Sequence, residues 1–177
     1  MIFRRTRIIA AAAAVAAAVL PLTPLVPASA ASADTPLLTC LGAVTQSYDP
    51  GLLLTPRTVT FTARVTYSTC VGGTVSTGTQ TVTASIVNSC LLNDPFSSNV
   101  GLVEWNTGQT SELTTSNVKV ISGGQIVVTD TGTVTSGLYA GKKVVQVTTI
   151  ATPNVLDCVG SGVTSASGVV SLTILPV

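Results

Sequence analysis

The chain from Thr58 to Cys70 alternates regularly between polar and apolar side chains. Its odd positions from Val59 to Tyr67 are apolar or aromatic, and its even positions from Thr58 to Ser68 are polar. Because successive side chains of a strand point to opposite faces, this pattern predicts a strand with one face in a core and one in water. The β-branched and aromatic residues also suit a pleated sheet.

Similar strand-like runs follow one another along the chain, separated by Gly, Pro and Asn clusters about every 8 to 12 residues. This spacing is typical of an antiparallel sandwich or barrel, and we expect an all-β antiparallel β-sandwich, immunoglobulin-like, with about eight or nine strands and two disulfides. The expected strands are 38–48, 58–70, 79–87, 100–105, 110–122, 125–135, 144–152 and 167–175, with a short apolar run at 52–54.

Three glycine-containing sites predict two turns and one bulge. Asp49-Pro50-Gly51 predicts a turn, because proline presets φ and glycine tolerates positive φ. Gly123-Gly124 predicts a two-residue hairpin turn between its flanking strands. A bulge is expected near Gly132, since an isolated glycine inside a strand often marks one.

The first 30 residues have the pattern of a secretory signal peptide. Arg4, Arg5 and Arg7 precede an apolar stretch, Ile8–Leu20, that is too short to span a bilayer. Two Ala-Ser-Ala triplets follow, so cleavage is expected after Ala30 or Ala33. The general secretory route is favoured over twin-arginine export and over a membrane anchor. We therefore expect residues 1–30 to be removed and residues 31–177 to form one secreted, extracellular domain without a membrane span.

Charge argues against an anionic partner. Three of the eight basic residues lie in the expected signal peptide and none of the seven acidic ones does, so the mature charge is five minus seven, or −2. This balance gives no electrostatic case for binding nucleic acid.

The four cysteines, Cys40, Cys70, Cys90 and Cys158, predict two disulfides. No C-x-x-C pair and no histidine are present, so zinc-ligand spacing is missing and we expect no metal. An antiparallel hairpin centred near residue 55 would place Cys40 opposite Cys70, within reach of a disulfide. The predicted pairs are Cys40–Cys70 and Cys90–Cys158.

Candidate catalytic residues are few. Without histidine there is no Ser-His-Asp triad, and a disulfide-bonded cysteine is no nucleophile. Glu104 and Glu112 flank one turn and could form a carboxylate pair, but two solvated side chains on an outer face are favoured. Asp130-Thr131-Gly132 matches the tripeptide of pepsin-like proteases, in a single copy that chance explains. We expect no catalytic residue, no cofactor and no enzymatic activity.

The aromatic and basic residues point to structural roles. Trp105 is expected in the core, against a disulfide as in immunoglobulin-like sandwiches, rather than on a sugar-binding platform. Tyr48, Tyr67 and Tyr139 are expected at the rim of the core. The pair Lys142-Lys143 is expected to guard a sheet edge.

Several segments resemble a family of small secreted actinobacterial all-β proteins of uncharacterised function: Tyr48–Leu52, Asn88–Cys90, Val103–Ser111 and Gly132–Gly141. The resemblance implies secretion and a β fold and brings no catalytic residue with it.

The expected function is a non-enzymatic extracellular module for binding or surface association, whose partner is an extracellular ligand or cell-surface component. One alternative is a carrier of a small apolar ligand, which resembles the secreted immunoglobulin-like apoproteins of actinomycetes, although their cysteine spacing differs. Another is a protease inhibitor using the loop Leu91–Asn99. A deep pocket would favour the carrier, and a flat surface with one protruding loop the inhibitor.

Reduction of the two disulfides should lower the melting temperature, because each crosslink restricts the unfolded chain. In the chain-entropy model the shorter loop contributes roughly 3.7 kcal/mol and the longer about 4.4 kcal/mol, which is large beside a net stability of about 5–15 kcal/mol. Thermal unfolding with and without reductant measures this effect, and an unchanged melting temperature would contradict it.

Overall fold

The computed structural model describes residues 35–91 and 99–177. The expected signal peptide, residues 1–30, and most of the loop Leu91–Asn99 lie outside these residues. The described chain forms antiparallel strands and one short 3₁₀ helix: β1 (Leu38–Leu52), β2 (Arg57–Val71), β3 (Gly78–Asn88), β4 (Asn99–Trp105), β5 (Thr110–Ser122), β6 (Gln125–Gly137), β7 (Lys143–Ala151), η1 (Val155–Cys158) and β8 (Val163–Leu175). The predicted all-β antiparallel class is confirmed.

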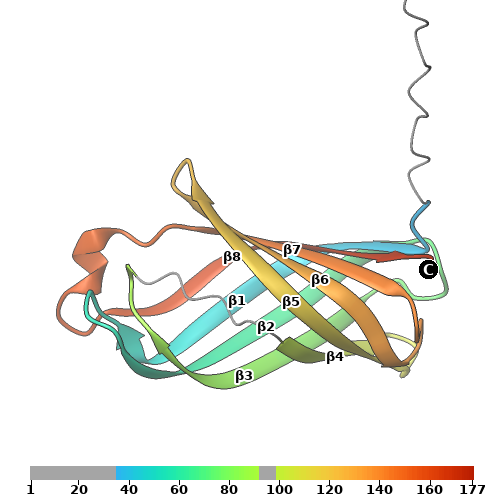
Figure 1. Ribbon diagram of the computed structural model, residues 1–177, viewed down its shortest axis with the longest axis horizontal. Coiled ribbons are helices and arrows are strands. Elements are labelled where there is room, and N and C mark those ends of the chain that lie inside the picture. Colours follow the sequence, from blue (N-terminus) through green and yellow to red (C-terminus); the bar gives the residue numbers. More distant parts are fainter. Residues whose placement is uncertain (1–34, 92–98) are drawn as a thin grey trace, which may run out of the picture. The chain divides into compact units, whose positions relative to one another are not determined.

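The eight strands close into a barrel, so the predicted immunoglobulin-like sandwich is wrong in its architecture (Figure 1). Each strand pairs with the next one in sequence, and β8 returns to pair with β1 from Leu38↔Ile174 to Ser47↔Ser165. A sandwich keeps two separate sheets, whereas here one continuous sheet closes on itself. Alternation and turn spacing are common to both architectures, and only the contact between the two ends of the chain distinguishes them.

Strand β4 is the shortest strand of the barrel wall. It pairs with β5 from Asn99 to Glu104, but with β3 only from Gly78 to Thr81. The rest of β3, Val82–Asn88, pairs with β2 on one side, and no strand in the described ranges pairs with it on the other. The ladder between β3 and β4 is therefore shorter than the ladders between the other neighbouring strands.

The predicted turn at Asp49-Pro50-Gly51 is wrong, because these residues continue β1. The β1–β8 ladder is irregular between Ser47 and Leu52, where β1 has no paired residue in β8. A proline lacks the N–H of a ladder hydrogen bond, so it is accommodated where the ladder is already interrupted. Residues 53–56 make the connection to β2 instead.

The second predicted turn is confirmed, and a bulge lies close to its predicted place. Gly123 and Gly124 both have positive φ, 58° and 75°, in a two-residue hairpin between Ser122 and Gln125. The register of β5 and β6 shifts between Glu112 and Leu113, which face Ser136 and Val134, so the extra residue is Thr135 of β6. This bulge lies three residues after Gly132, which itself pairs with Thr115.

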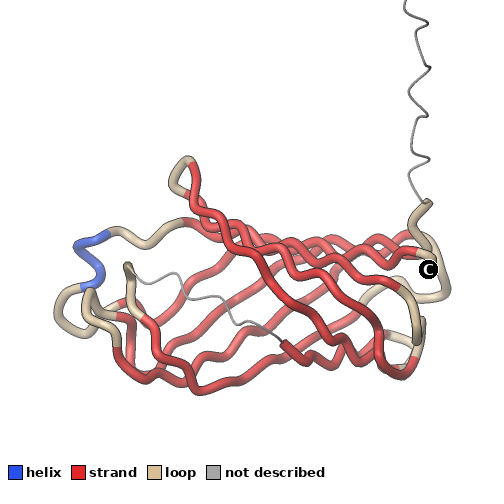
Figure 2. The backbone as a smooth tube through the Cα atoms, in the orientation of Figure 1, coloured by secondary structure: helices blue, strands red, loops and turns tan. Residues whose placement is uncertain are grey.

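The predicted cysteine pairs are both present. Cys40 and Cys70 are direct register partners on β1 and β2, with Cα atoms 4.0 Å apart. Cys90, just after β3, joins Cys158 in η1 with a Cα separation of 6.2 Å. Figure 2 shows η1 at the end of the barrel that also carries the β1–β2 and β5–β6 connections. Within the described ranges, no helix combines the length and the apolar character needed to cross a membrane.

The opposite end of the barrel is filled by a packed core around Trp105, which is 3% exposed. Its indole lies 6.2 Å from the Tyr67 ring and 6.5 Å from the Tyr139 ring, centroid to centroid. Gly78 leaves room for the indole, since a Cβ there would meet Trp105. The core position predicted for Trp105 is confirmed. The rim position predicted for Tyr67 is wrong, because Tyr67 is fully buried.

The polar atom of Trp105 is satisfied inside this core. Its Nε1–H donates to Ser111 Oγ (2.8 Å), and the Ser111 hydroxyl donates to the Leu138 carbonyl (2.6 Å). We therefore expect Ser111→Ala to lower the free energy of unfolding by about 1–3 kcal/mol, because it leaves a buried donor and acceptor unpaired. Chemical denaturation measures the change. Ser116→Ala, on the exposed face of the same strand, is the control and should stay within about 0.5 kcal/mol. Equal effects of the two substitutions would contradict the role of Ser111.

Candidate functional site

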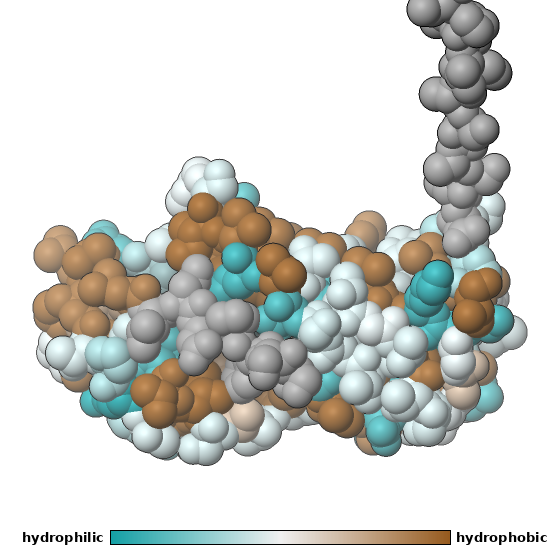
Figure 3. All heavy atoms as spheres, viewed as in Figure 1, coloured by the Kyte–Doolittle hydropathy of each residue, from teal (hydrophilic) through white to brown (hydrophobic). Residues whose placement is uncertain are grey.

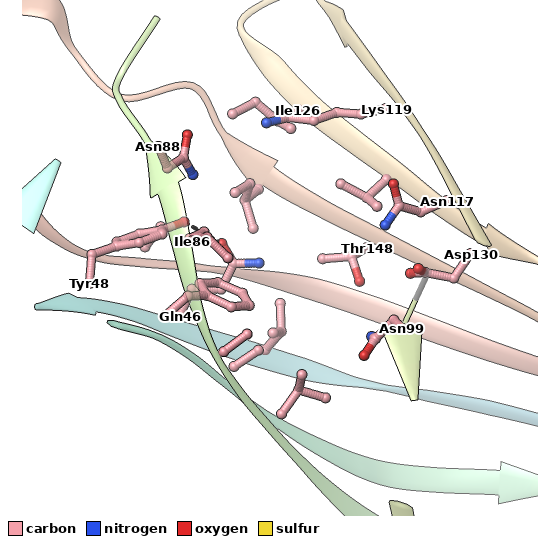
Figure 4. A pocket seen from close by; sticks show the side chains of 18 of the residues that line it. Gln46, Tyr48, Ile86, Asn88, Asn99, Asn117, Lys119, Ile126, Asp130 and Thr148 are labelled. Atoms are coloured by element: carbon pink, nitrogen blue, oxygen red, sulfur yellow. Dashed lines mark hydrogen bonds between the residues drawn. The ribbon is translucent and has the colours of Figure 1, made fainter. Parts of the chain in front are cut away.

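The end of the barrel that carries η1 contains a cavity of about 280 Å³. Inward-facing side chains from all eight strands line it, and Figure 4 shows several of them directed into it from β1, β5, β6 and β7. Eight-stranded barrels enclose just enough space for packed side chains or for one small ligand. This barrel has both, with the Trp105 core filling one end and the cavity at the other.

Apolar side chains form the walls of the cavity toward its mouth. Tyr48 and Phe61 lie on adjacent strands with ring centroids 5.6 Å apart. Together with Leu52 and Val59 they form a separate small cluster of buried residues. Ile86, Ile126 and Ile150 extend the apolar lining. The Tyr48 hydroxyl donates to Gln46 Oε1 (2.7 Å), and burial raises the pKa of Tyr48 to about 12.

A polar layer forms the floor of the cavity, between these walls and the Trp105 core. Asn117, Asp130 and Gln146 are direct register partners across β5, β6 and β7. Residues opposite each other on neighbouring strands bring their Cβ atoms to about 4.5–5.5 Å. Tyr67 and Gln80 complete the layer, since the Tyr67 hydroxyl lies 2.7 Å from Gln146 Oε1 and 3.1 Å from Gln80 Oε1.

Asp130 carries the only carboxyl group among the residues that line the cavity in the described chain. It is 8% exposed, and this burial raises its pKa to about 6, while a side-chain hydrogen bond with Asn117 lowers it. Burial and the nearby Asp130 carboxylate both raise the pKa of Tyr67, so its hydroxyl remains a donor at neutral pH. A buried carboxyl group therefore faces the cavity, and within the described chain its main hydrogen-bonding neighbour is Asn117.

The rim around the mouth is apolar as well. Val155, Leu156 and Val159, in and beside η1, are all exposed, and Figure 3 shows apolar surface gathered at this end of the molecule. The Cys90–Cys158 disulfide fixes η1 to the end of β3. The mouth is thus a crosslinked, apolar edge around a cavity with a polar floor.

The other residues singled out in the sequence lie away from the cavity. Glu104 and Glu112 are on the outer face of the barrel, and Glu112 accepts a hydrogen bond from Thr135 (3.1 Å). Lys143 pairs with Thr133 on one side and Leu175 on the other, so the predicted edge-guarding role of Lys142-Lys143 is wrong. Within the described ranges, no three His, Cys, Asp or Glu side chains come together as metal ligands.

Sequence reasoning missed most of the polar floor. Gln80 lies on the same inward face of its strand as Val82, Ala84 and Ile86. Gln146 likewise lies on the same inward face of its strand as Val144 and Ile150. A polar residue at an inward position of a strand is the signal that could have identified them. Asp130 was noticed, but as part of a protease tripeptide rather than as a buried carboxyl group.

Asp130 should make stability depend on pH. A pKa of about 6 in the folded protein against 3.8 ordinarily means that the folded state holds its proton more tightly than the unfolded chain. Stability is therefore highest below about pH 4 with respect to this group, falls as pH rises to about 6, and stays reduced above it. Asp130→Asn removes this effect. The quantity to compare is the free energy of unfolding of the variant minus that of the wild type. We expect this difference to be about 2–3 kcal/mol more positive at pH 8 than at pH 4.

Chemical denaturation of both proteins at the two pH values tests this expectation. Taking the difference between variant and wild type cancels the contributions of the other titrating groups. A difference that is the same at both pH values would show that Asp130 ionises as easily in the barrel as in the unfolded chain.

No family model matches this chain, and no curated protein or solved structure matches it either. The resemblance to secreted actinobacterial proteins therefore stays a prediction, and the cavity is the feature of the described chain that bears on function.

Proposed function

We propose that the protein is a non-enzymatic, extracellular binding protein that holds one small amphipathic molecule inside its barrel. The observation that carries this proposal is the cavity of about 280 Å³, with apolar walls and a polar floor. Small-molecule sites are typically concave and mostly apolar, with a few polar groups that orient the ligand. At roughly 30 Å³ per water molecule, the cavity has the volume of about nine waters, which suits a small ligand.

The polar floor favours ligand binding over a purely structural interior. A core built for stability alone would continue the packing of Leu38, Trp105 and Ile174 along the barrel. Instead the interior places Gln80, Asp130 and Gln146 below an unfilled space. Buried polar groups reduce stability unless they are fully paired. A bound molecule that pairs with them and covers the apolar walls would offset this loss.

This proposal selects the carrier among the alternatives that the sequence left open. Module-like surface association needs no interior cavity. The inhibitor hypothesis depends on Leu91–Asn99, of which residues 92–98 lie outside the described chain, so it stays a prediction. The extracellular location is supported by the two disulfides and by the signal-like segment at residues 1–30. The lack of histidine supports a non-enzymatic role.

A matched pair of substitutions on β3 tests binding inside the barrel. Ala84 lines the cavity, and its neighbour Ser85 is exposed on the outer face. We expect Ala84→Phe to reduce binding of the neutral fluorescent probe N-phenyl-1-naphthylamine by about tenfold or more, since its ring would occupy the ligand space. Ser85→Phe adds the same ring outside and should leave binding unchanged.

The readout is probe fluorescence titrated against protein, with unfolding curves to show that both variants fold. Absence of probe binding to the wild type, or equal binding by the two variants, would contradict a site inside the barrel. Mass spectrometry of small molecules that copurify with the wild type but not with Ala84→Phe would identify a natural ligand.

A further inference from the structure

We propose that the cavity selects a protonated amine on an apolar body, with the ammonium group held by Asp130 and Asn117. This inference rests on the proposed function and assigns the chemical class of the ligand. It follows from the charge in the cavity, from the acceptor oxygens in its floor, and from the position of the apolar walls.

The first step concerns charge. Asp130 is almost fully buried, and the main influences on its carboxyl group within the described chain are this burial and the hydrogen bond with Asn117. Lys119 also lines the cavity, but in Figure 4 its side chain extends toward Ile126 and away from Asp130. A buried carboxylate without a cationic partner is unfavourable. A cation bound beside it would remove that penalty, whereas a carboxylate ligand would add to it.

The second step concerns Asn117. A carboxylate only accepts hydrogen bonds, so Asn117 presents its NH₂ group to Asp130. Its Oδ1 atom is then directed elsewhere, and it is buried without a hydrogen-bond partner. Buried polar atoms are almost always paired in folded proteins. An acceptor without a hydrogen-bond partner, beside a buried carboxylate, indicates a ligand that donates hydrogen bonds.

The third step concerns the side-chain oxygens of the two glutamines. The Tyr67 hydroxyl lies within hydrogen-bond distance of both Gln80 Oε1 and Gln146 Oε1. It carries one proton and can donate to only one of these oxygens at a time. A primary ammonium group has three N–H donors, which match acceptors from the Asp130 carboxylate, Asn117 Oδ1 and the remaining glutamine oxygen.

The fourth step places the rest of the ligand. With its ammonium group on the floor, the molecule extends toward the mouth along Phe61, Ile126 and Ile150. These three side chains are apolar and suit an aliphatic or aromatic body. Lys119, on β5, is a cationic residue of the same lining.

Three probes of equal chain length separate this inference from the general proposal: octylamine, octanol and sodium octanoate. Isothermal titration of the protein with both disulfides formed, near neutral pH, should give octylamine an affinity about ten- to a hundredfold above that of octanol. This range is typical of a charged hydrogen bond. Octanoate should bind more weakly than octanol, because it brings a second negative charge to Asp130.

Two substitutions assign the effect to Asp130. Asp130→Asn keeps the size of the side chain and should reduce octylamine binding to the level of octanol, while octanol binding changes by no more than about threefold. Asp157→Asn is the matched control, because it removes the same charge from an exposed position in η1 at the mouth. It should leave the preference for octylamine in place.

The outcomes separate the two proposals. Equal binding of octylamine and octanol, an unchanged preference in Asp130→Asn, or a preference lost in Asp157→Asn would overturn the amine assignment and leave a barrel site for apolar molecules. Binding of none of the three probes, together with no binding of N-phenyl-1-naphthylamine, would overturn both. Because the comparison of probes uses the wild type, it does not depend on the folding of any variant.

Discussion

The pairing of β1 with β8 is the interaction on which the rest of the structure depends. It joins the first and last strands of the described domain along most of the length of β1. Without it the eight strands would form an open meander with two unpaired edges, and the inward faces would have no common interior. The Cys40–Cys70 disulfide crosslinks β1 to β2 beside this seam. Closure gives the inward faces of the eight strands one enclosed interior.

The interior of the barrel differs between its two ends, with a packed core at one end and a cavity at the other. At one end Trp105, Tyr67 and their neighbours form a buried apolar cluster, and the buried polar atoms of Trp105 and Ser111 are paired with each other. At the other end the side chains stop short of filling the barrel. The polar layer with Asp130 lies between the two regions, so the hydrogen-bonding groups form the deepest part of the cavity.

The closed end and the open end contribute differently to stability. Packing around Trp105 buries large apolar side chains and stabilises the fold. The carboxyl group of Asp130 and the unpaired Asn117 oxygen oppose it, because both are removed from water without full compensation. Local features that reduce stability are expected where a site has a function beyond folding. The Cys90–Cys158 disulfide lies at the same end and holds the mouth together where packing is weakest.

The sequence by itself determined the strand content, the cysteine pairs, the Gly123-Gly124 hairpin and the buried position of Trp105. These features depend on local rules: the two-residue period of a strand, the backbone freedom of glycine, and the distance across one hairpin. Only the tertiary structure decided that the sheet closes, since β1 and β8 are far apart in sequence and their pairing leaves no local signal. For the same reason it alone decided that Tyr67 is buried and that Asn117, Asp130 and Gln146 share one row. Alternation shows which side of a strand a residue takes, but which side chains meet there depends on the register between strands.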